Sequence, residues 1–154
     1  MPSSDLLVDL YQQDFKKIDL EFKIKRVLST DGDQIIDFIL KRFSPRWASE
    51  VKSGLYKPNP FCFIATDGQQ IIGFACYDAT AKGFFGPMGV DENYRSKGIG
   101  ASLVVQCLEA MYFDGYAYAI IGGVSERTQP FYYKTCKALP IENSRKIYSR
   151  MFDR

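Results

Sequence analysis

The chain has 154 residues, a length typical of one compact domain, and we expect a single domain over residues 1–154. Hydrophobic residues make up 46% and charged residues 25%, as in an ordinary globular protein. The net charge of +2 is too small to favour nucleic acid or a membrane surface as a partner. The sequence contains no histidine, which excludes Ser-His-Asp and Cys-His nucleophile systems and any zinc site that needs imidazole. We therefore expect no metal site, and any catalysis must move protons through other groups.

The cysteines indicate a reducing compartment. Cys62, Cys76, Cys107 and Cys136 are too far apart in sequence for a metal knuckle or a redox dithiol, and their neighbours are apolar. Buried, reduced thiols are the simplest interpretation. Residues 1–20 contain no hydrophobic segment of the signal-peptide type, and no apolar run is long enough to cross a bilayer. We expect a cytoplasmic protein.

The first third of the chain predicts helices around one strand. Apolar residues at near-helical spacing over 5–18 predict an amphipathic helix within an N-terminal extension of residues 1–20. Alternating apolar and basic residues over 22–28 predict a strand with one solvated face. A helix over 35–43 and further helical turns over 47–55 follow. The predicted apolar face of the first of these helices contains Ile35, Ile36, Ile39, Leu40 and Phe43.

The middle of the chain changes to a strand pattern. Residues 61–66 and 70–77 predict two strands that a turn at Asp67-Gly68 joins into a hairpin. Residues 81–90 predict a third strand. It is interrupted by Gly83, Gly86, Pro87 and Gly89. Because proline donates no ladder hydrogen bond and interior glycine often marks a bulge or a close backbone approach, this broken strand is a candidate site.

The last third predicts a strand between two helices. Apolar residues repeat with helical period over 99–111, and Gly115 ends that helix. Residues 116–124 form an apolar strand that we expect to be buried on both faces, and 126–137 predict a shorter helix. Residues 138–152 predict one or two closing strands. The order of the elements indicates a mixed α/β domain with a strand–helix–strand unit at its centre.

Residues 88–102, MGVDENYRSKGIGAS, lead from the broken strand directly into a helix. The first helical turn carries backbone N–H groups without intrahelical partners and the positive end of the helix dipole. Gly98 and Gly100 leave those groups accessible, and Arg95 and Lys97 add positive charge. The segment therefore predicts an anion-binding site that suits a pyrophosphate. The alternative is a glycine-rich turn with solvated charges. The dinucleotide and nucleoside-triphosphate glycine patterns are both absent.

Two motifs resemble one known family. Val90-x4-Arg95-x2-Gly98-Ile99-Gly100, and later Phe131-Tyr132-Tyr133-Lys134, are similar to signatures of the GNAT superfamily of acetyl-CoA-dependent N-acetyltransferases. The Arg46-Trp47 pair and residues 120–124 resemble one uncharacterised bacterial subgroup. The resemblance implies an α/β (α+β) fold with a mixed, mostly antiparallel central sheet, a splayed strand pair and helices on both faces.

The resemblance also implies roles for individual residues. Backbone groups of Met88 and Val90 would pair with the pantetheine arm of acetyl-CoA. Backbone amides would hold the pyrophosphate, and they belong to Arg95, Ser96, Lys97, Gly98, Ile99, Gly100 and Ala101. Tyr132 would protonate the leaving thiolate. The alternative for Tyr132 is a tyrosine that only packs in the core.

The implied reaction is direct transfer of an acetyl group from acetyl-CoA to a primary amine of a small molecule or peptide in a ternary complex. Asp78, Glu50 or a water chain is the general base. Arg46, Trp47 and Tyr56 lie in the region where this fold forms its acceptor pocket. The partners are acetyl-CoA and an amine acceptor, and a homodimer is possible. The alternatives are an acyl-CoA-binding sensor without turnover and a phosphate-binding module for ordinary nucleotides.

Overall fold

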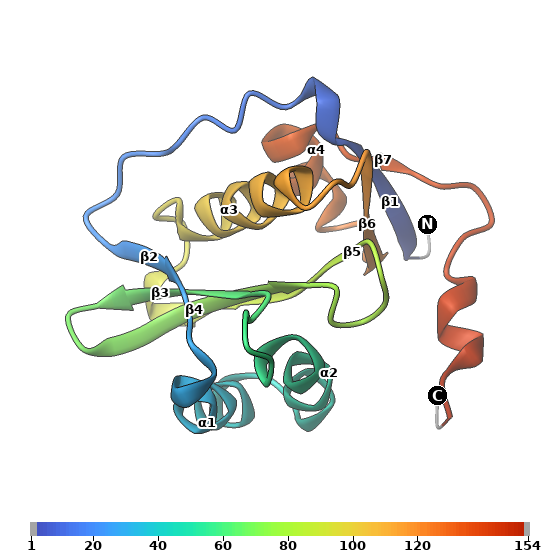
Figure 1. The fold of residues 1–154 in the computed structure, drawn as a ribbon. Coiled ribbons are helices and arrows are strands. Elements are labelled where there is room, and N and C mark those ends of the chain that lie inside the picture. The colour runs from blue at the N-terminus through green and yellow to red at the C-terminus, as the bar shows by residue number, and fades with distance from the viewer. Residues whose placement is uncertain (1–2, 153–154) are drawn as a thin grey trace.

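The computed structural model describes residues 3–152, which form one seven-stranded sheet (Figure 1). The strands are β1 (Ser4–Asp9), β2 (Lys23–Arg26), β3 (Cys62–Asp67), β4 (Gln70–Tyr77), β5 (Phe84–Val90), β6 (Tyr118–Val124) and β7 (Leu139–Pro140). Their order across the sheet is β2-β3-β4-β5-β6-β1-β7. Neighbouring strands are antiparallel except β5 and β6, which run parallel.

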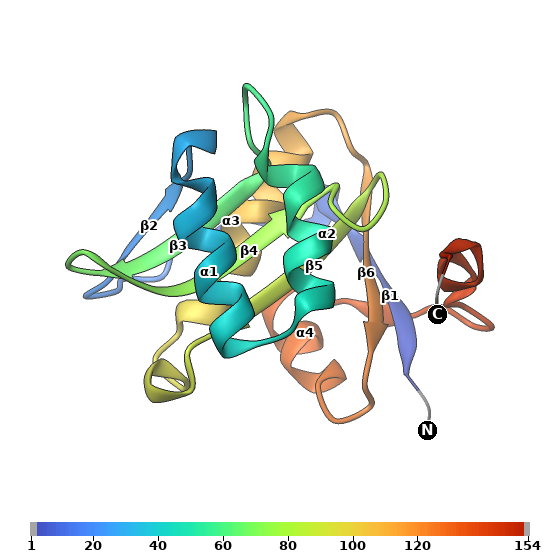
Figure 2. The same ribbon diagram turned by 90° about the horizontal axis from the view of Figure 1, so that it is seen from below.

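Helices cover both faces of this sheet. Figures 1 and 2 show α1 (Gly32–Arg42) and α2 (Pro45–Leu55) on one face, and α3 (Ile99–Phe113) and α4 (Gln129–Cys136) on the other. Each helical layer packs on its own apolar cluster, so the sheet separates two cores. The predicted fold class, a mixed and mostly antiparallel sheet flanked by helices, is confirmed.

Helices α1 and α2 lie where helical segments were predicted, over residues 35–43 and 47–55, but both begin earlier than predicted, at Gly32 and Pro45. The Ser44 hydroxyl accepts a hydrogen bond from the Trp47 backbone N–H at 3.1 Å, and Pro45 occupies the first turn of α2. The predicted apolar face of α1 is correct except at one position. Leu40 is half exposed, and Phe38 is buried in its place. Phe38 contacts the rings of Phe43 and Phe74, which draws its side of the helix toward the sheet.

The predicted N-terminal helix is wrong. Residues 4–9 form β1, which pairs with β6 and β7 near one end of the sheet, and Leu10–Gln12 form a single 3₁₀ turn. Leu6, Val8 and Leu10 are fully buried, with the period of two that a strand requires. Pairing with β6 therefore outweighs the weak helical spacing of this segment. Residues 13–22 run as an irregular strap past α3 toward β2 (Figure 1). Residues 1–2 of the predicted extension lie outside the described residues.

The C-terminal third also differs from its pattern. Strand β6 buries Ala119 and Ile121 on one face, but Ile120 and Gly122 on its other face are only half-buried, so the strand is not buried on both faces as predicted. Helix α4 ends at Cys136, and the next residue, Lys137, adopts the left-handed conformation usually taken by glycine. The predicted closing strands reduce to the two residues of β7, and a 3₁₀ helix, η4 (Lys146–Arg150), follows. None of the helices within residues 3–152 is long and apolar enough to span a membrane.

Candidate active site

The two central strands separate in the middle of the sheet. Strands β5 and β6 pair only at Phe84↔Ile120 and Phe85↔Ile121. From Gly86 onward β5 continues along β4 alone. The splay therefore leaves one edge of β5 without a neighbouring strand over residues 86–90.

Backbone groups at this open edge belong to the residues predicted to bind pantetheine. Asp91 N donates to Ile72 O at 2.8 Å, across the junction of β5 and β4. Since antiparallel strands alternate in the direction of their hydrogen bonds, Val90 and Met88 direct their N–H and C=O groups away from β4. The Val90 carbonyl accepts from Arg95 Nε at 3.1 Å, which agrees with this direction.

The N-terminus of α3 faces the same opening. Ser96 and Gly98 both have left-handed backbone conformations, with φ of 65° and 86°. The first intrahelical bond runs from Ser102 N to Gly98 O at 3.1 Å, so the amides of Ile99, Gly100 and Ala101 have no intrahelical acceptor. Three amides without intrahelical acceptors at the positive end of a 15-residue helix are an arrangement that suits an anion.

A cavity of about 470 Å³ connects the open edge of β5 with this helix N-terminus, and we call it the cradle cavity. Eight of the nine predicted cofactor-binding residues line it, namely Met88, Val90, Arg95, Ser96, Gly98, Ile99, Gly100 and Ala101. The ninth, Lys97, is exposed and does not line it. The free amides, the open strand edge and the glycines fit the pyrophosphate and pantetheine parts of an acyl-CoA.

Sequence reasoning missed the part of the cradle that α1 supplies. The Phe43 ring lies so close to Gly89 that a Cβ atom there would be 2.5 Å from the Phe43 Cζ atom. Phe43 also contacts Trp47, with ring centroids 5.3 Å apart. Gly89 therefore serves a close approach between β5 and the end of α1. No local pattern identifies Phe43 as the neighbour.

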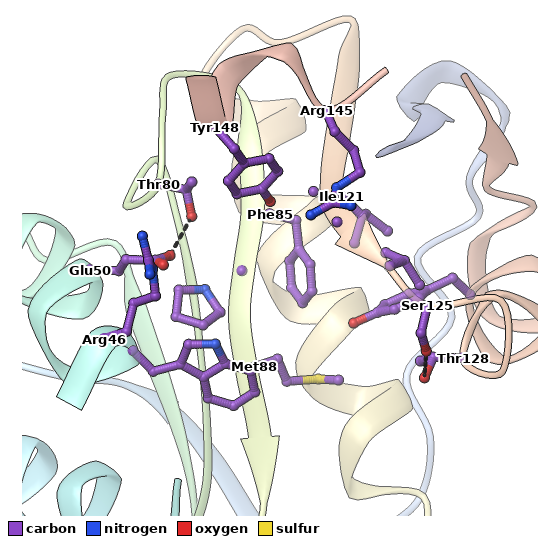
Figure 3. Close-up of a pocket in the computed structure, with 17 residues that line it drawn as sticks. Arg46, Glu50, Thr80, Phe85, Met88, Ile121, Ser125, Thr128, Arg145 and Tyr148 are labelled. Carbon is purple, nitrogen blue, oxygen red and sulfur yellow. Dashed lines mark hydrogen bonds between the residues drawn. The ribbon is translucent and has the colours of Figure 1, made fainter. Parts of the chain in front are cut away.

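A second cavity of about 470 Å³ lies on the other side of the splay, and we call it the β6 cavity (Figure 3). Arg46, Trp47 and Glu50 of α2 line one wall, and Arg145 and Tyr148 of the C-terminal segment line the opposite wall. Residues of β5 and β6 form its floor. Trp47 and Met88 line both cavities, so the two cavities meet at the splay.

Tyr132 of α4 lines the β6 cavity, and its side chain is 7% exposed. Its ring packs against Phe85 and Phe131, with centroids 6.2 and 5.0 Å apart. No group within residues 3–152 makes a hydrogen bond to its hydroxyl. Burial, with smaller contributions from Cys136 and Cys107, raises the pKa of the Tyr132 phenol well above its usual value. The phenol is therefore a protonated group at the cavity wall.

Of the two candidate general bases, one lines the β6 cavity and the other does not. Asp78 does not line either cavity; its carboxylate accepts from Gly83 N at 2.7 Å and from the Tyr116 hydroxyl at 2.8 Å. Burial and the bond to Asp78 raise the pKa of Tyr116 to about 12. Asp78 thus fixes the loop before β5. Glu50 lines the β6 cavity, where its Oε2 accepts from the Thr80 hydroxyl at 2.8 Å.

Only two of the three residues predicted for the acceptor pocket line the β6 cavity. Arg46 and Trp47 line the β6 cavity, but Tyr56 lies outside it. The Tyr56 hydroxyl donates to Asp33 at 2.9 Å, and its ring packs over Gly32 at the start of α1. Tyr56 is therefore a contact between α2 and α1, and that part of the prediction is wrong.

Two residues of the β6 cavity come from the tail, where strands were predicted. Tyr148 lies over the glycines of β6, and a Cβ atom at Gly122 would be 2.5 Å from its hydroxyl. Gly122 and Gly123 in the printed sequence are the signal that something packs closely there, although they do not say what. Arg145, three residues before Tyr148, was not singled out by any pattern.

All four cysteines are free and buried, as predicted. Burial raises the pKa of Cys107 and Cys76 well above the usual thiol value and that of Cys136 to about 11. A neutral buried thiol is a poor nucleophile, so these cysteines do not suit an acyl-enzyme route.

Comparison with known proteins agrees with this geometry. Residues 24–137 match the Acetyltransferase (GNAT) family, and the chain belongs to that family of acetyltransferases. No curated protein matches the chain by sequence.

Solved structures share the fold at low sequence identity. A GCN5-related glucosamine N-acetyltransferase region of a fungal multi-domain GH3 β-N-acetylglucosaminidase aligns with a TM-score of 0.72 and 16% identity, covering 92% of this chain and 20% of the other. A GCN5-related N-acetyltransferase from Sphaerobacter thermophilus aligns with a TM-score of 0.69 and 19% identity, covering 92% of this chain and 50% of the other. The Escherichia coli N-acetyltransferase YhbS, solved with CoA, aligns with a TM-score of 0.50 and 24% identity, covering 66% of this chain and 62% of the other. The chain thus spans about a fifth of the length of the fungal protein and about half of the length of the Sphaerobacter protein.

Proposed function

We propose that the protein transfers an acetyl group from acetyl-CoA directly to a primary amine of a small molecule or peptide. The observation that carries this proposal is the meeting of two cavities at Met88 and Trp47. One cavity offers free helix amides and an open strand edge, and the other contains a buried phenol and a carboxylate. Two substrates bound in the two cavities meet at the splay, which suits transfer in a ternary complex.

Each group of the chain has a role that its position supports. Acetyl-CoA supplies the acetyl group as an activated thioester. The amides of Ile99, Gly100 and Ala101 bind its pyrophosphate, and the N–H groups of Met88 and Val90 orient its arm and carbonyl oxygen. The Tyr132 hydroxyl donates a proton to the leaving sulfur. Glu50, directly or through water, accepts a proton from the amine.

The test combines turnover with kinetics. Purified protein is incubated with acetyl-CoA and a panel of amino acids, amino sugars, polyamines, aminoglycosides and peptides, and released CoA is followed with a thiol reagent. We expect at least one acetylated amine, detected by mass spectrometry, and initial rates that give intersecting double-reciprocal plots. Parallel plots or an acetylated cysteine would contradict direct transfer. CoA binding without turnover on any amine would favour the sensor.

Replacing Glu50 by Gln tests the proposed base. The amide keeps the shape and still accepts from Thr80, but it does not take a proton. We expect kcat/KM to fall by about 100-fold near pH 7 and less at higher pH, where more of the amine is already neutral. Glu126→Gln, which removes a carboxylate that lines neither cavity, is the control. An unchanged rate in Glu50→Gln would leave the water route as the base.

The cytoplasmic location, the possible homodimer and the single-domain organisation stay predictions from the sequence.

A further inference from the structure

We infer that the amine acceptor carries a carboxylate and that Arg145 binds it. This inference rests on the proposed function, because it names the class of molecule that occupies the β6 cavity. It is carried by the position of the Arg145 side chain and by its buried Nε atom, which has no hydrogen-bond acceptor within residues 3–152.

The backbone around Arg145 is fixed by a buried carboxylate. Asp5 of β1 is 6% exposed, and its Oδ2 accepts from the Arg145 N–H at 3.0 Å. Its Oδ1 accepts from the Gly123 N–H at 2.8 Å, on the strand that forms the cavity floor. The Ser144 hydroxyl oxygen accepts a hydrogen bond from the Asp5 N–H at 2.8 Å, which adds another contact between β1 and this segment. Asp5 therefore holds the C-terminal segment against β6 at the point where Arg145 begins.

The Arg145 guanidinium has an N–H group that no described residue pairs with. Its Nε is buried and has no hydrogen-bond acceptor within residues 3–152. No carboxylate within residues 3–152 forms an ion pair with it, and its guanidinium carbon lies 5.5 Å from the centroid of the Tyr148 ring. A buried cationic N–H without an acceptor is costly. The missing acceptor is most simply supplied by a ligand in the cavity that this side chain lines.

The charge of the cavity points to an anion. Its charged lining residues are Arg46, Arg145 and Glu50, and Arg145 is the one with a buried N–H that has no acceptor among residues 3–152. Figure 3 shows Arg145 reaching toward Ile121 and Phe85, on the wall opposite Arg46 and Glu50. An amine that also carries a carboxylate matches this arrangement, with its carboxylate on the Arg145 fork and its nitrogen toward Glu50 and Tyr132. A cavity of about 470 Å³ suits a small amino acid-like molecule.

The carboxylate takes no part in the reaction. The amine nitrogen bonds to the acetyl carbonyl carbon, the C–S bond breaks, the nitrogen loses one proton and the sulfur gains one. Arg145 acts only in binding and orientation. Its effect therefore depends on whether the acceptor has a carboxylate, which a general loss of structure would not reproduce.

The experiment compares each proteinogenic L-amino acid with its own α-carboxamide as acceptor. For the best acceptor, we expect wild-type kcat/KM to favour the acid over the amide by about 30-fold. Arg145→Gln should reduce this ratio below about 3-fold, because kcat/KM for the acid falls while kcat/KM for the amide does not. Arg145→Lys should keep part of the ratio. Lys146→Gln removes one exposed neighbouring charge and leaves the ratio unchanged. Equal rates for acid and amide, an unchanged ratio in Arg145→Gln, or a preference for O-phosphoethanolamine over every amino acid would overturn the inference.

A binding measurement separates this inference from the proposed function. If no amine is acetylated, the proposed function fails, and the same acids and amides are titrated into the CoA-bound protein while thermal unfolding is followed. Stabilisation by an acid in wild type, and not in Arg145→Gln, supports the carboxylate site. Lack of stabilisation by any acid of the panel overturns it.

Discussion

Tyr132→Phe should reduce kcat by about 100-fold or more and leave CoA affinity within about 2-fold of wild type. The phenol lies at the wall of the β6 cavity, and the leaving thiolate must take a proton from somewhere near the splay. Removal of the hydroxyl takes away that proton and little else, because the hydroxyl has no hydrogen-bond partner within residues 3–152. The ring contacts with Phe85 and Phe131 remain. The measurement is steady-state turnover together with calorimetric titration of CoA.

The neighbouring tyrosine is the matched control. Tyr133 lies on the same helix but is 51% exposed and lines neither cavity. Tyr133→Phe should therefore retain wild-type kcat. The free energy of unfolding should change by less than about 1 kcal/mol in either variant, as urea denaturation can verify. Full activity in Tyr132→Phe would make Tyr132 a core tyrosine and assign the proton to water.

The pKa of Tyr132 predicts the form of the pH profile. Burial raises this pKa, so the neutral, proton-bearing form persists to higher pH than for an exposed tyrosine. The acid therefore stays protonated across the usual assay range, and kcat should not fall between about pH 8 and 10. The rising limb follows deprotonation of the amine or of Glu50. A descending limb below about pH 9 in wild type would show that another group supplies the proton.

The cradle could be predicted from the sequence because its determinants are contiguous. An open strand, two cations, two glycines and a helix start follow one another within residues 88–102, and these local features are what predicts an anion site there. Of the nine residues predicted to bind the cofactor, Lys97 does not line the cradle cavity, and its side chain is exposed. The charge that matters more is Arg95, which bonds the Val90 carbonyl at the open edge.

The β6 cavity could be predicted only in part because it is assembled from distant segments. Arg46, Glu50 and Tyr132 were candidates in the sequence, but Arg145 was not. Arg46 and Glu50 come from α2, Tyr132 from α4 and Arg145 from the tail, and only the sheet brings them together. The error at residues 5–18 has the same origin. Apolar residues there satisfy a helical spacing and a strand spacing equally well, and the choice is made by pairing with β6. The same pairing places Asp5 beside the backbone of Arg145. Because the N-terminal segment was predicted as a helix, this contact could not be expected from the sequence.

Gly100→Val should weaken CoA binding by about 100-fold, or about 2.7 kcal/mol, without unfolding the protein. A Cβ atom at this position would lie 3.5 Å from Phe131 Cζ and 3.8 Å from Val90 Cγ2, at ordinary contact distance. The backbone accepts a side chain there, since Gly100 is not among the residues with positive φ. The two methyl groups of valine then occupy space next to the free amides, where a pyrophosphate must approach closely.

Gly100 is a better position for this substitution than Gly98. Gly98 has a φ of 86°, and a Cβ there would lie 3.3 Å from Leu20 of the strap, so Gly98→Val adds about 1–2 kcal/mol of backbone strain to any effect on binding. Gly100→Ala gives a graded comparison: it adds one carbon, favours the helix by about 0.5–1 kcal/mol and should weaken CoA by only a few fold. Calorimetric titration measures the CoA affinity of each variant, and urea denaturation measures its free energy of unfolding. A folded Gly100→Val protein that binds CoA as tightly as wild type would show that the N-terminus of α3 does not hold the pyrophosphate.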